Sequence, residues 1–169
     1  CSSVRKNNFR NWSINNYAQV IDTLINEKKI QVILTGGPSD QEKFYAQQIT
    51  KHCQHEVINL VGKTSLMQLL ALMQQSRFII APDTGPAHMG TAAGIPVIGL
   101  YASSNPHRTG PYNSKKHWVN AYPTAMRQFN HKNVDAARWG ERIRAPEVMD
   151  LITVEDVLKK AFSCLEKNA

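Results

Sequence analysis

Residues 77–94, with the sequence RFIIAPDTGPAHMGTAAG, contain a strand, a turn and a helix in direct succession. After Arg77 the segment continues with four apolar residues, which is typical of a buried strand. A polar turn follows, and the small residues 87–93 predict a helix that Gly94 ends. A strand that passes through a short turn into a helix is the unit from which parallel sheets are built.

The same alternation continues on both sides of this segment. Aliphatic and β-branched residues predict strands at residues 30–35, 57–60 and 95–101. Residues that favour helix N-caps precede segments with apolar residues three and four positions apart. They predict helices after Ser13, after Ser39 or Asp40, after Ser65 and after Thr153. Strands and helices that alternate with short connections predict an α/β fold, a Rossmann-like parallel sheet with helices on both faces.

Helical spacing also predicts which residues face the core. It places Phe44, Tyr45 and Ile49 on the inner face of the second helix, and Leu66 among the apolar positions of the third. From residue 102 to residue 146 the pattern weakens, and glycine, proline and isolated aromatic residues predict a long loop with short elements. Loops of that length in compact domains often carry a function.

Length and composition favour one ordinary globular domain over residues 1–169, with no apolar run of the ~18 residues that a membrane-spanning helix needs. Cys1, Cys53 and Cys164 are too far apart for a zinc motif or a disulfide framework, which favours a reduced, cytoplasmic setting. The net charge of +7 fits phosphorylated ligands, an anionic membrane surface or a plain solvated surface. No usual nucleic-acid motif accompanies it, so we expect no nucleic-acid partner.

The strongest candidate site follows the strand at residues 77–81. Ligands of parallel sheets bind beyond the carboxyl ends of the strands. There the sequence places the carboxylate of Asp83, the hydroxyl of Thr84, the backbone of Gly85 and the imidazole of His88. The helix N-terminus behind them is suited to a phosphate. A cap for the helix is the alternative interpretation, but a cap needs neither the glycine nor the histidine.

Weaker candidates follow the first two strands and precede the first helix. Glycines after the first strand let a ligand approach the backbone, or form a plain turn. The loop after the second strand resembles the end of a Walker loop, but the glycine that begins that motif is missing. An arginine beside Trp12 would reach a phosphate or lie on the surface. The residues are Thr35, Gly36 and Gly37; Gly62, Lys63 and Thr64; and Arg10.

Together these segments resemble the C-terminal domain of glycosyltransferase family 9, whose best-known members are ADP-heptose:lipopolysaccharide heptosyltransferases. The matching stretches are ILTGGPSDQE (33–42), NLVGKTSLMQLLALM (59–73), APDTGPAHMGTAAGIPVIGLYASSNP (81–106) and MDLITVEDVLKKAF (149–162), with a basic residue before Trp12. The family has the two-domain GT-B architecture, in which the nucleotide sugar binds the C-terminal domain and the acceptor the N-terminal one. The resemblance, with an opening Cys1 rather than Met, implies that the acceptor domain is absent from this chain.

The resemblance also implies a set of donor-binding residues. Those that would hold the diphosphate and the sugar are Asp83, Thr84, Gly85, Pro86 and His88. Those that would line the nucleotide pocket, or lie near its base and ribose, are Thr35, Gly36, Gly37, Glu42, Gly62, Lys63, Thr64 and Leu66. Arg10 stands where family members usually have a phosphate-binding lysine, so a bidentate fork replaces a point charge.

The implied reaction is an inverting sugar transfer that needs no metal and no cofactor. Its general base would come from the absent domain, so no catalytic residue is assigned here and the fragment is expected to be inactive. The expected partners are an ADP-heptose-like donor and, through the absent domain, a lipopolysaccharide core or other glycolipid acceptor, with peripheral contact to the inner membrane through charge. The alternatives are a nucleotide-binding or regulatory module without transfer activity, and a basic module for anionic lipid or nucleic acid.

Overall fold

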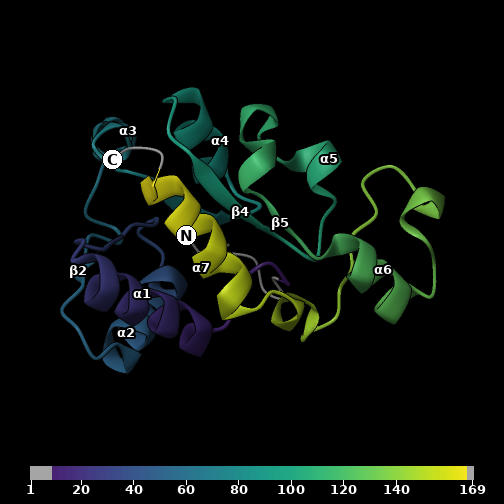
Figure 1. The fold of residues 1–169 in the computed structure, drawn as a ribbon, viewed down its shortest axis with the longest axis horizontal. Helices are drawn as coiled ribbons and strands as arrows, with labels where there is room; N and C mark the ends of the chain where they lie inside the picture. Colours follow the sequence, from purple (N-terminus) through teal and green to yellow (C-terminus); the bar gives the residue numbers. More distant parts are fainter. Residues whose placement is uncertain (1–8, 167–169) are drawn as a thin grey trace.

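The computed structural model describes residues 9–166 and contains two parallel sheets (Figure 1). In the first sheet, β1 (Ile33–Leu34) pairs with β2 (Ile58–Asn59). In the second, β4 (Val97–Tyr101) lies between β3 (Ile79–Pro82) and β5 (Val119–Asn120). All these pairings are parallel, which confirms the predicted α/β fold class. The predictions that concern Cys1 and the rest of residues 1–8 fall outside the described residues.

Helices cover the sheets from both sides. On the three-stranded sheet, α4 packs against β3 and β4, and α7 packs against β4 and β5 from the other side (Figure 1). No helix within residues 9–166 is long and apolar enough to cross a bilayer. The α-helices are α1 (Ile14–Lys28), α2 (Asp40–His52), α3 (Leu66–Gln74), α4 (Gly85–Ala92), α5 (Pro106–Thr109), α6 (Tyr122–Asn130) and α7 (Val154–Glu166). The 3₁₀ helices are η1 (Tyr112–His117), η2 (Val134–Ala136) and η3 (Val148–Leu151).

Serine side chains begin the first three helices as predicted. The hydroxyls of Ser13, Ser39 and Ser65 accept hydrogen bonds from the backbone N–H three residues later, which satisfies a donor that the helix itself leaves free. At Ser65 the Gln68 side chain also accepts from the Ser65 backbone N–H, which completes a capping box. These caps fix where the loops after the strands end.

Two main hydrophobic cores hold the fold together, and a third, small cluster of Ala81, Ala87 and Val97 packs α4 on β3 and β4. The larger joins β4 and β5 to α1, α6 and α7, and contains the fully buried Trp12, whose indole N–H donates to the Ile152 carbonyl at 2.9 Å. The smaller core lies between α1 and α2 and is made by Ile21, Ile49 and Val57. Because α1 contributes to both cores, it connects the part of the molecule around β1 and β2 with the part around β3 to β5.

Residues 102–146 contain short elements separated by loops, as predicted: α5, η1, β5, α6 and η2 occupy about half of them. Two other local predictions need correction. Phe44 is 61% exposed and Leu66 is 72% exposed, so neither belongs to the core. The helical spacing was right, but these two side chains lie on exposed faces of their helices. The strands β1 and β2 are also shorter than predicted.

Candidate functional site

Most of the predicted site residues lie in the three loops that follow β1, β2 and β3, or in the first turns of the helices after those loops, whereas Arg10 precedes α1. The first two loops are in contact, because the Gly62 N–H donates to the Gly36 carbonyl at 3.0 Å. Gly62 has a φ of +74°, and a side chain there would also lie 3.1 Å from the Pro38 backbone. The glycine is therefore needed both for its backbone conformation and for the close approach of the two loops.

Glu42 covers the glycine turn after β1. Its carboxylate accepts a hydrogen bond from the Ser39 hydroxyl at 3.2 Å, and the residue is only 7% exposed. A Cβ added at Gly37 would stand 2.6 Å from one Glu42 oxygen, and one at Gly36 would stand 3.2 Å from the other. The two glycines thus make room for a buried carboxylate, which is a physical reason for Gly-Gly that a plain turn does not need.

The other side of this loop pair is open. Lys63 is exposed and its ammonium donates to the Asn59 carbonyl at 3.1 Å. At the start of α3, Leu66 and Met67 are 72% and 73% exposed. Thr64 lies between Lys63 and these two residues in the sequence and is half-buried. A planar apolar group could lie against these side chains, with the loop glycines beside it.

Asp83 is the centre of the third loop. The residue is 6% exposed, and its backbone carbonyl accepts a hydrogen bond of 2.6 Å from the Arg10 guanidinium. Arg10 and Arg142 each have a guanidinium nitrogen 3.9 Å from Oδ2 of Asp83. Within residues 9–166, that oxygen makes no hydrogen bond. Two cations that share one carboxylate leave this corner with a net positive charge.

Tyr101 lies close to the same carboxylate from the neighbouring strand β4. Burial, and then the negative charge of Asp83, raise the pKa of the Tyr101 phenol far above its usual value. The phenol oxygen is buried and makes no hydrogen bond to any other residue that the structure describes. A neutral hydroxyl therefore stands beside a buried carboxylate at the end of the sheet.

The N-terminus of α4 lies directly after Asp83. Thr84 is extended and its hydroxyl donates to the Pro82 carbonyl at 3.2 Å, so it makes no side-chain cap for the helix. A cap is thus not what this loop forms. Gly85 and His88 are exposed, and a side chain at Gly85 would meet no atom within 4 Å. The positive end of the helix dipole and the imidazole are both open to a ligand.

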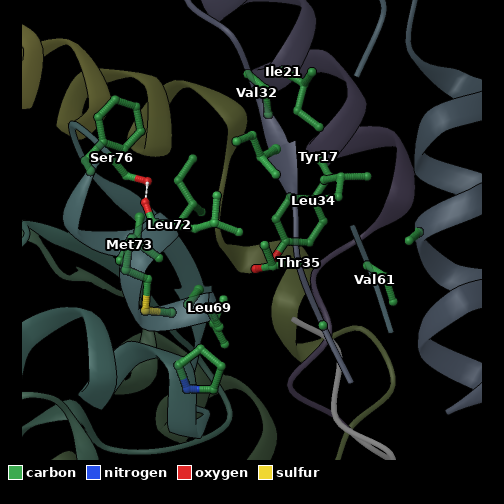
Figure 2. A pocket seen from close by; sticks show the side chains of 18 of the residues that line it. Tyr17, Ile21, Val32, Leu34, Thr35, Val61, Leu69, Leu72, Met73 and Ser76 are labelled. Atoms are coloured by element: carbon green, nitrogen blue, oxygen red, sulfur yellow. Dashed lines mark hydrogen bonds between the residues drawn. The ribbon is translucent and has the colours of Figure 1, made fainter. Parts of the chain in front are cut away.

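The predicted residues fall into two groups. The first consists of Thr35, Gly36, Gly37, Glu42, Gly62, Lys63, Thr64 and Leu66, and the second of Arg10, Asp83, Thr84, Gly85, Pro86 and His88. A cavity of about 540 Å³ lies below both, between the sheets, and only Thr35, Gly36, Glu42 and Pro86 of these residues line it (Figure 2). Its walls are mostly aliphatic. The cavity is therefore distinct from the surface at the loops.

Arg142 is a candidate that sequence reasoning did not single out. It follows the weakly patterned region, and no local motif marks it. The Ile143 N–H donates to the Ser103 carbonyl at 2.9 Å, which ties this segment to the end of β4 beside Asp83. Only the loose basic cluster of residues 127–144 pointed to this region. Within residues 9–166, no three His, Cys, Asp or Glu side chains are grouped to hold a metal ion.

Comparison with known proteins gives consistent matches. The sequence model described as glycosyltransferase family 9 (heptosyltransferase) matches residues 1–137. The lipopolysaccharide core heptosyltransferase OpsX of Haemophilus influenzae is 36% identical over 159 residues, which cover 94% of this chain and 44% of that protein. The chain therefore spans less than half the length of this relative.

Solved structures match in fold. A family 9 glycosyl transferase from Veillonella parvula superposes with a TM-score of 0.74 at 25% identity, over 98% of this chain and 44% of the other. The E. coli heptosyltransferase WaaC, solved with ADP, superposes with a TM-score of 0.65 at 20% identity, over 99% of this chain and 42% of the other. The fold is thus that of one part of a GT-B heptosyltransferase.

Proposed function

Because the chain belongs to glycosyltransferase family 9, we propose that it is the domain of a glycosyltransferase that binds the nucleotide-sugar donor. The proposed reaction is the inverting transfer of heptose, or a related sugar, from an ADP-sugar to a lipopolysaccharide core acceptor. The relationship to lipopolysaccharide core heptosyltransferases supports this class of donor and acceptor. The chain spans 44% of such a relative, so the acceptor site and the general base are assigned to a second domain, and this chain alone is expected to be inactive.

The observation that carries the proposal is the pair of guanidinium groups on Asp83, at the N-terminus of α4. Arg10 and Arg142 each lie 3.9 Å from one Asp83 oxygen, so the carboxylate orients two forks without neutralising both. A leaving diphosphate gains negative charge as the sugar leaves, and oriented cations and helix N–H groups stabilise that charge without a metal. Asp83 is thus a positioning residue, and the two arginines are the diphosphate ligands.

The nucleoside is assigned to the loops after β1 and β2. Gly36 and Gly37 have no side chains, so the nucleoside can approach their backbone closely, and the Glu42 carboxylate lies beside both glycines. The exposed Lys63, Thr64 and Leu66 then flank the ribose and base. A nucleotide in this position would extend toward Gly85 and His88, which places its diphosphate at the arginines.

The basic surface also fits the place where a lipid acceptor is made. A net charge of +7 favours contact with an anionic bilayer through a screened, peripheral attraction. We propose a cytoplasmic protein that touches the inner membrane in this way. Its test is sedimentation with phosphatidylglycerol vesicles at 50 and 300 mM salt. Binding only at low salt agrees with the proposal, and equal recovery with neutral phosphatidylcholine vesicles contradicts it.

The donor site is tested by calorimetric titration of the chain with ADP, GDP and UDP. We expect ADP to bind most tightly, and Arg10→Gln and Arg142→Gln each to weaken binding by about 10- to 100-fold, the size of a charge-assisted hydrogen bond. Arg127→Gln is the matched control, because Arg127 is an exposed arginine on α6. Equal weakening by all three variants would reduce the effect to net charge and contradict a specific site.

A module without transfer activity is the alternative to a donor domain. The two differ once the chain is produced together with the polypeptide that completes a family-length protein. Sugar transfer from an ADP-sugar to a lipopolysaccharide core, lost in Arg142→Gln, supports the donor domain. Nucleotide binding with no transfer from any nucleotide sugar supports the module.

A further inference from the structure

The cavity between the two sheets has the shape and chemistry of a place for one more strand. Residues 30–36 around β1 line one side of it and residues 77–81 around β3 line the other. Aliphatic side chains cover the space between them. Figure 2 shows Val32 and Leu34 on the β1 side, and Leu69, Leu72 and Met73 of α3 facing them.

The backbone of both edge strands also faces this cavity. The Val32 carbonyl accepts from the N–H of Ile58 in β2, and the Leu34 carbonyl from the N–H of Leu60 just after it; hydrogen-bonding groups alternate sides along a strand. Ile33 lines the cavity, and its backbone N–H and C=O therefore point away from β2 and toward the cavity.

The same holds on the opposite edge. The Ile79 N–H donates to the Pro96 carbonyl just before β4, so the groups of Ile80 point toward the cavity that Ile80 also lines. Two buried edges that face each other across apolar space can both be satisfied by one parallel strand between them.

The order of the strands leads to the same place. Across the molecule the order is β2, β1, cavity, β3, β4, β5. The doubly wound Rossmann order is 3-2-1-4-5-6, in which strand 1 lies at the centre of the sheet. The five strands of this chain match positions 3, 2, 4, 5 and 6 of that order, and the cavity stands at position 1. Strand 1 is joined to its neighbour by a crossover helix that packs over both. Here α1 precedes β1, and its residues Tyr17, Ile21 and Leu24 line the cavity.

The chain just before α1 lies where such a strand would emerge. Arg10 donates to the Asp83 carbonyl at the carboxyl end of β3. Tyr45 of α2, on the β1 side, donates from its hydroxyl to the Trp12 carbonyl. The segment that leads into α1 is therefore held between the ends of the two edges.

We propose that this cavity receives a β-strand from the polypeptide that directly precedes Cys1, as the central parallel strand of one continuous six-stranded sheet. The lining calls for a run of about six aliphatic residues, whereas the sequence from Ser2 to Asn8 is polar apart from Val4. A relative of which this chain spans 44% has ample chain to supply the run. The inference rests on the proposed continuation of the chain, but not on nucleotide binding.

The test is amide hydrogen exchange, read by mass spectrometry, on this chain and on the same chain extended by the twenty residues that precede Cys1 in its gene. We expect peptides that cover residues 30–35 and 78–82 to exchange at least 10-fold more slowly in the extended chain, with a higher melting temperature. The buried strand β4 is already paired on both sides, so the change there should be smaller. A Gly-Ser extension of equal length is the control and should protect nothing.

Three outcomes would overturn the proposal. The first is full protection of both edges in the 169-residue chain, which would mean that they are already paired. The second is equal exchange with the natural and the Gly-Ser extension. The third is protection that rises with protein concentration together with a dimer, which would assign the strand to a second copy. None of these results depends on whether ADP binds, so the failure of this inference and of the donor site can be distinguished.

Discussion

At the scale of single residues, Tyr101 and Tyr122 are a natural matched pair. Each is 1% exposed in the larger part of the fold. The Tyr122 hydroxyl donates to the Glu141 carbonyl at 2.9 Å, whereas the Tyr101 hydroxyl has no hydrogen-bond partner among the described residues. A buried polar group without a partner costs about 1–3 kcal/mol, and a satisfied one contributes about 0.5–1.5 kcal/mol.

We therefore expect opposite effects from the same substitution. Tyr101→Phe should leave the free energy of unfolding unchanged or raise it, and Tyr122→Phe should lower it by about 1 kcal/mol. Urea denaturation of the two variants and the parent chain measures both changes. A loss of stability at Tyr101 as large as that at Tyr122 would mean that the Tyr101 hydroxyl has a partner, and Asp83 would be the first to examine.

A stable Tyr101→Phe variant would also indicate that the Tyr101 hydroxyl serves ligand binding rather than folding. A hydroxyl that costs stability beside a buried carboxylate is easier to understand where a ligand completes the arrangement. In the titration proposed above, Tyr101→Phe should then weaken ADP binding less than Arg142→Gln, since a neutral donor is worth less than a guanidinium.

At the scale of elements, Gly90 sets how closely α4 approaches the sheet. A Cβ at this position would lie 2.4 Å from Cδ1 of Ile79 on β3 and 3.0 Å from Cγ2 of Val97 on β4. Gly85 at the start of the same helix has no atom within 4 Å of a Cβ position. The close packing matters for function because α4 presents its N-terminus beside Asp83.

Gly90→Ala should consequently destabilise the chain by about 1–3 kcal/mol through overpacking, and shift α4 outward. Gly85→Ala, with the same change of residue, should stay within about 0.5 kcal/mol of the parent. Thermal denaturation of both variants compares them directly. Equal stability of the two would show that Ile79 moves aside freely and that the sheet does not fix the position of α4.

Elements also show how far the sequence alone could lead. The helices that begin at Ser13, Ser39 and Ser65 were predictable because a cap and an apolar period coincide. The elements β5 and α6 were not, because β5 has two residues and α6 begins after Ala121 without a side-chain cap. Their positions depend on packing that no local pattern contains.

The candidate site divides in the same way. The turn around Asp83 was predictable, because a strand, a polar loop and a small-residue helix follow one another in the sequence. The role of Arg142 beside it was not, because it depends on the bond between Ile143 and Ser103, forty residues apart. The cavity between β1 and β3 was equally hidden, since strand order is a property of the assembled fold.

At the scale of the whole molecule, the two main hydrophobic cores lie in two different parts of the fold. The larger core, which contains Ile98, joins β4 and β5 to three helices, whereas the smaller core around Ile49 holds α2 to α1 beside β1 and β2. The cavity of about 540 Å³ separates the two parts. We infer that the part around β1 and β2 opens by itself, while the rest stays folded.

Two matched substitutions test this, because Ile→Val removes one methylene from either core, at a cost of about 0.5–1.5 kcal/mol, or roughly 2- to 10-fold in exchange rate. Ile98→Val should speed amide exchange of Leu100 and leave that of Ile58 unchanged, since local opening of β2 does not disturb the larger core. Ile49→Val should speed both, because opening of the smaller part and global unfolding each disrupt its core. Exchange measured by NMR distinguishes the cases. If Ile98→Val speeds both amides equally, the chain unfolds as one cooperative unit, and the cavity is no mechanical boundary.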